Sequence, residues 1–362
     1  MSWVGLADAA RAEFDLTGLT NRPRRHALKL ADRPHAQACR GTLLFEANVA
    51  QFTVPRPLLA MALGASFSIS FAFGENDKLD FSLSVGDASW EEHLPLKITD
   101  ELQVVRVSLA WDTATGAAVL SVFQPRSQHL AQVLLTGPKP VPWAALRTLI
   151  HDAPGMCGQN DVTFVALSRA FEPAGAMPGL TRRTPVSTPG GSMHIHEITP
   201  GDSVLGVDGR AHQVRAVAKR ILPARGSFAP HHLRAPYLGL AEDLRVSGET
   251  LIELQGSDVE YFLGVERVLA QANQVAEREA PFQAAGHITV CYYQLILDQP
   301  ELLDLGIGLM SLNLGAAEAA GLASVTTLWA DMAGSGVSAH LSPPYPLARP
   351  YEVVTLNANR AA

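Results

Sequence analysis

The sequence predicts a mostly β protein with two domains, on three observations. Residues 67–73 (FSISFAF) and 79–85 (LDFSLSV) alternate large apolar residues with small or polar ones, which is the pattern of half-buried strands. A polar turn separates the two runs, so together they predict a hairpin. A chain of 362 residues is long enough for two hydrophobic cores. A segment rich in Pro and Gly, residues 171–179, is the best boundary between them.

The first half contains further strand signals. Residues 105–111 and 118–123 predict a second hairpin, and residues 161–167 predict a late strand. Residues 3–14 predict a short helix at the start of the chain. Strands with one apolar face must bury that face against another sheet, so we expect a β-sandwich.

The second half predicts shorter strands. Residues 203–207 and 212–217 flank the dipeptide Asp208-Gly209, which favours a type I′ hairpin because both turn positions then have φ > 0. Residues 244–247 and 251–254 frame another short turn. We therefore expect an all-β second domain.

Composition excludes several functions. The net charge is −7 and no stripe of Lys and Arg occurs, so we expect no nucleic-acid partner. No run of about 18 apolar residues predicts a membrane span. The first residues do not resemble a secretory signal, which leaves a cytoplasmic location or export by a signal-independent route. The three cysteines have no CxxC spacing, and no cofactor or metal is predicted.

Residues 42–171 resemble the concanavalin A-like (laminin-G-like) sandwich. A strand ending in Trp-Asp, a short loop with Gly and a returning strand recur in that fold, and Trp111, Asp112 and Gly116 match them. Many proteins with this fold bind sugars, and many others are structural. Trp90 would be the residue to stack on a sugar ring, although a tryptophan in a sandwich more often packs in the core.

The second half resembles the bacterial proteins of the Hint (Hedgehog/intein) superfamily over residues 179–356. The resemblance is carried by an ordered series of segments. They are 184–191 (TPVSTPGG), 198–205 (ITPGDSVL), 243–247 (DLRVS), 268–270 (VLA), 290–295 (VCYYQL), 311–315 (SLNLG) and 348–352 (ARPYE). We expect an N-terminal extension at 1–41, the sandwich at 42–175, a Hint-like domain at 179–315, and a segment at 316–362 that completes it.

This resemblance implies a self-processing reaction. Members use a Cys or Ser at the first residue of the domain to attack the preceding carbonyl in an N-to-S or N-to-O acyl shift. A histidine in a Ser/Thr-x-x-His block polarises that peptide bond and protonates the leaving amide. An amide is a poor electrophile and an amine is a poor leaving group, so nucleophile and acid must both be in place.

Other residues occupy most of these positions in this chain. The nucleophile position falls at Gly179, and Thr181 carries the nearest hydroxyl. In the Ser-x-x-His block, Ser247 is present but Thr250 replaces the histidine. Glycine has no nucleophile, and threonine cannot exchange protons near neutral pH.

Two later positions complete the comparison. Bacterial members carry a histidine where this chain has Gln294, and the Asp-Arg-His-like stretch after it keeps only Asp298. Loss of both nucleophile and acid should abolish processing. The resemblance therefore predicts a Hint fold without Hint catalysis.

Three functions remain open at this point. The first is a non-catalytic protein that acts in binding or assembly, with a protein or glycan partner. The second is a carbohydrate-binding protein that uses the sandwich. The third is a self-cleaving protein in which Thr181 is the nucleophile and His194, His196 or His287 supplies the proton. Cys157 is a further conceivable nucleophile, but it lies about 22 residues too early and within the predicted sandwich.

Overall fold

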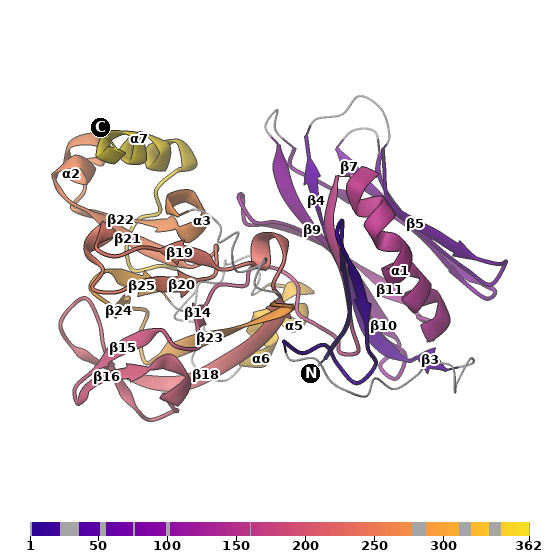
Figure 1. The fold of residues 1–362 in the computed structure, drawn as a ribbon, viewed down its shortest axis with the longest axis horizontal. Coiled ribbons are helices and arrows are strands. Elements are labelled where there is room, and N and C mark those ends of the chain that lie inside the picture. Colours follow the sequence, from indigo (N-terminus) through magenta and orange to yellow (C-terminus); the bar gives the residue numbers. More distant parts are fainter. Residues whose placement is uncertain are drawn as a thin grey trace. The chain divides into compact units, whose positions relative to one another are not determined.

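The computed structural model describes residues 2–21, 36–50, 56–74, 77–98, 102–159, 161–276, 287–310, 320–332 and 342–361. The chain forms two compact units. The first comprises Met1–Gly175, Arg225–Ser227 and Gly321–Thr327, and the second comprises Ala176–Ala224, Phe228–Ala320 and Leu328–Ala362. Strands dominate both units (Figure 1), so the predicted mostly β fold class is confirmed.

The first unit contains a seven-stranded antiparallel sheet. In spatial order its strands are β11 (His129–Thr136), β10 (Ala117–Gln124), β9 (Gln103–Asp112), β4 (Arg40–Val49), β13 (Val162–Ser168), β1 (Trp3–Asp8) and β2 (Ala12–Phe14). β9 and β10 form the hairpin predicted around Trp111 and Asp112. Gly116 has a φ of +70° in the turn between them, a conformation that favours glycine.

A four-stranded sheet completes the sandwich. Its strands are β5 (Arg56–Leu63), β6 (Phe67–Gly74), β7 (Lys78–Val85) and β8 (Ala88–Pro95). β6 and β7 form the predicted hairpin, and every second residue of β6 is buried. Phe71 of β6 meets Phe45 of β4 edge-to-face, with 5.0 Å between ring centroids, inside one core shared by both sheets. The predicted β-sandwich is therefore confirmed.

The predicted helix over residues 3–14 is wrong, because this segment forms β1 and β2. Helix α1 (Trp143–Gln159) packs on β1 so closely that a Cβ at Gly5 would lie 2.8 Å from Ile150 Cγ1. Val4, on β1, belongs to the sandwich core. A strand that is buried on both faces has no alternation of apolar and polar residues, so periodicity could not separate it from a helix. Two short strands, β3 (Gln37–Ala38) and β12 (Val141–Pro142), also pair in this unit.

The second unit is built mainly from two sheets and a hairpin. The larger sheet has the order β17 (Ser203–Leu205), β18 (Ala211–Pro223), β23 (Thr289–Leu297), β14 (Leu180–Thr181), β20 (Leu244–Val246) and β19 (His231–Leu233). The smaller sheet has the order β22 (Arg267–Gln271), β21 (Leu251–Gln255), β25 (Gly308–Met310) and β24 (Leu303–Asp304). β15 (Pro185–Thr188) and β16 (Gly191–His194) form the hairpin.

Short helices complete the described chain. They are α2 (Ser257–Leu263), α3 (Ala272–Val275), α5 (Ala323–Thr326), α6 (Leu328–Met332) and α7 (Pro350–Ala361). No helix among the described residues is long and apolar enough to cross a membrane.

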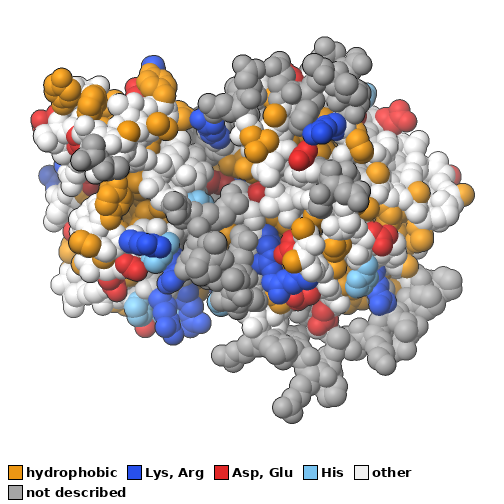
Figure 2. Space-filling view, turned by 45° about the horizontal axis from the view of Figure 1, so that its top comes forward, with side chains coloured by type: hydrophobic (Ala, Val, Ile, Leu, Met, Phe, Trp, Pro, Cys, Tyr) orange, Lys and Arg blue, Asp and Glu red, His pale blue; other side chains and the backbone are white. Residues whose placement is uncertain are grey.

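On the face drawn in Figure 2, basic side chains form small groups beside acidic ones. The segment 311–315, used in the resemblance, lies outside the described residues.

The structure corrects two details of the second half. β17 and β18 pair as predicted, but Gly209 has a positive φ (+73°) and Asp208 does not, so the turn is not type I′. The connection is instead a wider loop, in which the Gly206 N–H donates to the Arg210 carbonyl. β20 and β21 are strands as expected, but they belong to different sheets and do not pair with each other.

Candidate functional site

The candidate site forms where three strands of the six-stranded sheet meet. Leu180 of β14 pairs with Tyr293 of β23 on one side and with Val246 of β20 on the other. Both pairings are antiparallel, so the residue before Leu180 lies beside the residues that follow its two partners. These neighbours are Gly179, Gln294 and Ser247. Strand register therefore gathers three of the six sequence-predicted positions, and the turn after β20 adds Thr250.

The peptide bond between Pro178 and Gly179 is buried and is bound at both ends. The Gln294 side-chain amide donates to the Pro178 carbonyl at 2.7 Å. The Gly179 N–H donates to Thr250 Oγ1 at 3.0 Å. The self-processing reaction of the Hint pattern would attack this carbonyl. The bond is thus held in place, with a donor on its oxygen and an acceptor on its nitrogen.

Position 179 has little room for a side chain. Gly179 has a φ of +155°, which L-residues with a Cβ rarely adopt. A Cβ there would lie 2.9 Å from Tyr292 Cβ, 3.1 Å from the Tyr293 carbonyl oxygen and 3.3 Å from Gln294 Nε2. A cysteine or serine would bring the same Cβ. The neighbouring strand is therefore packed around a glycine.

The hydroxyls of Ser247 and Thr250 bind the backbone of the same junction. Ser247 Oγ donates to the Met177 carbonyl at 2.7 Å, and Thr250 Oγ1 donates to the Gly179 carbonyl at 3.0 Å. Their residues are 2% and 0% exposed. Neither hydroxyl titrates near neutral pH, and the Gln294 amide can donate a hydrogen bond but cannot release its proton.

Glu249 is a residue of this site that sequence reasoning missed. It is 2% exposed, and its Oε2 accepts a hydrogen bond from the Met177 N–H at 2.6 Å. The sequence contained one indication of its role, a carboxylate between Ser247 and Thr250. If that segment is buried, the carboxylate needs hydrogen-bond donors nearby. We call Ser247, Glu249, Thr250 and Gln294 the junction clamp, since all four bind the backbone of residues 177–179.

We expect Thr250→Val to destabilise the second unit by about 2 kcal/mol, because it removes a buried hydroxyl and leaves the Gly179 N–H without its acceptor. Amide hydrogen exchange at residues 179–181 should be faster in this variant than in wild type. Thr250→Ser keeps the hydroxyl and is the matched control, so it should stay close to wild type. Equal stability of the valine variant and wild type would contradict a clamping role.

Two predicted site residues lie outside the junction clamp. Thr181 follows Leu180 on β14, and its hydroxyl donates to the Arg245 carbonyl at 2.8 Å. Asp298 lies four residues beyond Gln294, which is roughly 13 Å along a strand. Its Oδ1 is 3.6 Å from His212 Nδ1 in a different polar cluster.

Cys157 and Trp90 both belong to the first unit. Cys157 lies on α1, where burial, followed by the charge of Asp8, raises the pKa of its thiol to about 12. At neutral pH it is therefore a protonated and unreactive thiol. Trp90 is half-buried on β8, packs against the sandwich core, and donates its indole N–H to the Thr136 carbonyl at 3.1 Å.

His194 and His196 lie beside each other at the end of β16, with 5.8 Å between ring centroids. Their Nδ1 atoms lie 3.0 Å from the carbonyls of Arg183 and Arg182, respectively. The same four side chains, with Glu242 and Asp243, line an open pocket of about 540 Å³ on the second unit.

Comparisons with known proteins give one family match and several distant structural similarities. No curated protein matches the sequence. Among solved structures, the Ruminococcus gnavus IT-sialidase CBM40 bound to α2,6 sialyllactose is similar, at 11% identity over 35% of this chain and 64% of that one, with a TM-score of 0.22. A toad ovary galectin in complex with thio-digalactose is similar at 12% identity over 38% and 86%, with a TM-score of 0.21.

The LG1–3 region of the laminin α2 chain is similar at 11% identity over 85% of this chain and 54% of that one, with a TM-score of 0.25. This chain thus spans less than two thirds of the sialidase and laminin chains. A family model for the Hint domain matches residues 178–305. The match begins at the junction itself, so the predicted Hint-type domain is confirmed for this part of the chain.

Proposed function

We propose that this protein is a non-catalytic Hint-type protein, in which the bond between Pro178 and Gly179 stays intact and the chain acts in binding or assembly. One observation carries the proposal. The position from which the Hint pattern attacks is a glycine with φ +155°, and Tyr292 occupies the space beside it.

The rest of the junction supports the same conclusion. A self-processing site needs a nucleophile, a donor on the carbonyl and a group that gives a proton to the leaving amine. Gln294 provides the carbonyl donor. The group on the amide nitrogen is Thr250 Oγ1, which already donates to the Gly179 carbonyl, and the nearby Ser247 hydroxyl donates to the Met177 carbonyl. The junction clamp therefore stabilises an unbroken chain. The partner that we propose is a protein or a glycan.

Intact mass spectrometry of the purified full-length chain tests this proposal. We expect one species of 38.7 kDa, unchanged after a day with a thiol or with hydroxylamine, because no ester or thioester forms. Thr181→Ala should behave identically.

The alternative predicts a different pattern of products. If Thr181 is a nucleophile, wild type will yield two fragments divided close to residue 180, hydroxylamine will increase their yield, and Thr181→Ala will remain whole. Fragments that divide between residues 178 and 179 in both proteins would show that the junction reacts by another route. Either result would overturn the non-catalytic assignment.

A further inference from the structure

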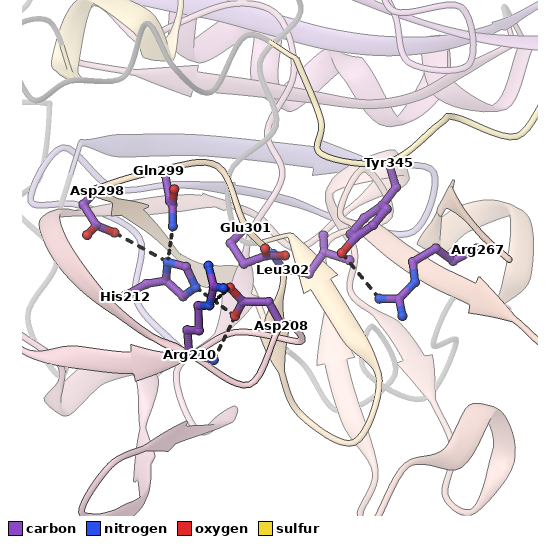
Figure 3. A network of polar contacts seen from close by, with 9 residues as sticks. All are labelled: Asp208, Arg210, His212, Arg267, Asp298, Gln299, Glu301, Leu302 and Tyr345. Carbon is purple, nitrogen blue, oxygen red and sulfur yellow. Dashed lines mark hydrogen bonds and ion pairs between the residues drawn. The ribbon is translucent and has the colours of Figure 1, made fainter.

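A second polar cluster in the second unit combines side chains that suit a divalent metal ion. Asp208 lies in the loop between β17 and β18, His212 lies on β18, and Glu301 lies on the segment after β23. One possible ligand atom from each of the three lies within 4.8 Å of the others. Figure 3 shows the imidazole of His212 between Asp208 on one side and Asp298 and Gln299 on the other.

Each ring nitrogen of His212 faces a polar side chain of the cluster. His212 is 1% exposed, and its Nε2 lies 3.0 Å from Asp208 Oδ1. Its Nδ1 faces Asp298 Oδ1 at 3.6 Å and Gln299 Nε2 at 3.3 Å. A metal-binding histidine typically presents one ring nitrogen to the ion while the N–H of the other nitrogen donates to a carboxylate or a backbone carbonyl. Asp298 lies where that carboxylate would be, on the Nδ1 side of His212.

The space between the three side chains depends on Gly206. A Cβ at this position would lie 2.7 Å from Glu301 Cγ, 2.8 Å from Asp208 Oδ1 and 2.9 Å from His212 Cδ2. Gly206 does not have a positive φ, so its backbone conformation does not require glycine. The absence of a side chain there is what lets the three candidate ligands converge.

We propose that Asp208, His212 and Glu301 bind a divalent ion of the zinc class. Two carboxylates neutralise the ion, and the imidazole favours Zn²⁺ over Mg²⁺ or Ca²⁺, which prefer oxygen ligands. Three protein ligands leave one position of a tetrahedral ion for water. Two ligands that are each about 2.1 Å from a tetrahedral ion lie about 3.4 Å apart. The 3.0 Å between His212 Nε2 and Asp208 Oδ1 therefore has to widen by a few tenths of an ångström when the ion binds.

Binding requires a defined proton position and a small rearrangement. The ion takes the lone pair of His212 Nε2, so the ring proton must move to Nδ1, where Asp298 can accept it. The Gln299 amide now presents its Nε2 to Nδ1, so it must turn away or present its oxygen instead. Glu301 Oε1 accepts the Leu302 N–H at 2.7 Å, which leaves Oε2 to turn toward the ion. Arg210 Nε lies 4.0 Å from Asp208 Oδ2, but the arginine side chain is 80% exposed and can turn into solvent.

The ion would join two segments that the backbone already connects. The Val207 N–H, next to the proposed site, donates to the Leu302 carbonyl at 3.0 Å. Coordination by Asp208 and Glu301 would reinforce this link, so we expect a structural ion that raises the melting temperature of the second unit.

Calorimetric titration of chelator-treated, full-length protein with Zn²⁺ tests the site. We expect one ion per chain, a higher Tm with Zn²⁺, and a much weaker effect of Mg²⁺ or Ca²⁺. Asp208→Asn and Glu301→Gln should each weaken binding by at least about tenfold, and Asp298→Asn by about tenfold through orientation of the imidazole. Asp208→Asn retains an oxygen that can accept from His212 and Arg210, so its fold should persist, which circular dichroism checks.

Two control variants separate this cluster from other surface histidines. Asp243→Asn removes an exposed carboxylate that lies 2.9 Å from His232 Nε2. This similar His–Asp pair has no third ligand among the described residues, so the substitution should not alter Zn²⁺ affinity. The double variant His194→Gln, His196→Gln should also bind one ion. Unchanged affinity in folded Asp208→Asn, binding lost only in the double histidine variant, or no saturable binding by wild type would each overturn the proposal.

Discussion

Gly179→Ala should destabilise the second unit by about 3 kcal/mol, because it combines an unfavourable backbone conformation with overpacking. The new methyl group would lie 2.9 Å from Tyr292 Cβ and 3.1 Å from the Tyr293 carbonyl oxygen, both on the neighbouring strand β23. β23 also pairs with β18, so it cannot move away without disturbing the centre of the sheet. The loss of stability should appear as faster amide hydrogen exchange of residues 287–297, measured by mass spectrometry.

Gly190→Ala is the matched control for this substitution. Gly190 lies in the turn between β15 and β16, and the nearest atom to an added Cβ is Thr188 Oγ1 at 3.9 Å. We expect its effect to stay within about 0.5 kcal/mol. Equal effects of the two alanine substitutions would contradict the tight packing at position 179. Gly179→Cys carries the same Cβ, so restoring the nucleophile of the Hint pattern should also cost stability.

Much of this site could be predicted from the sequence, because it depends on strand register. The resemblance placed Gly179, Ser247, Thr250 and Gln294 at the catalytic positions of the Hint pattern. The structure brings these four residues together. Their contacts with the backbone could not be predicted, because a motif gives positions and not hydrogen-bond partners. Asp298 shows the limit of the approach. It is close to Gln294 in the sequence, but it lies one residue beyond β23 and faces His212 instead.

The fold was predictable where one face of a strand is buried and the other is not. β6 and β7 alternate buried and half-buried residues along most of their length, and both were found from the sequence. β1 was mistaken for a helix, because five of its six residues are buried. Long-range packing could not be predicted from the sequence either. Residues 225–227 follow β18 in the second half of the chain, yet they belong to the first unit, where Glu46 accepts hydrogen bonds from the Ser227 N–H.

Replacing Arg225 by methionine should destabilise the first unit by about 3 kcal/mol at pH 7, because it leaves the partly buried Asp8 carboxylate without its ion-pair partner. Arg225 Nε lies 2.6 Å from Asp8 Oδ2, and the two side chains are 5% and 19% exposed. Burial raises the pKa of Asp8. The hydrogen bond from Arg225, two backbone N–H groups and the guanidinium charge outweigh burial, so the pKa lies below its ordinary value of 3.8.

The pH dependence follows from this lowered pKa. The stabilisation by ionised Asp8 is present above the unfolded-state pKa and is lost as the pH falls through the folded-state pKa. The difference between wild type and Arg225→Met should therefore be largest near pH 7 and should shrink towards pH 3. Urea unfolding followed by tryptophan fluorescence measures it, because the first unit contains four of the five tryptophans. They are Trp3, Trp90, Trp111 and Trp143.

Arg56→Met provides the matched comparison within the same unit. Arg56 Nη1 also lies close to an aspartate, Asp161, at 3.0 Å, but these side chains are 53% and 48% exposed. Solvent screens an exposed pair, so we expect a loss below about 1 kcal/mol and little change between pH 7 and pH 3. If both methionine variants lost the same free energy of unfolding, burial would not explain the contribution of the Arg225–Asp8 pair. A large loss in Arg225→Met alone would show that residues 225–227 are part of what holds the sandwich together.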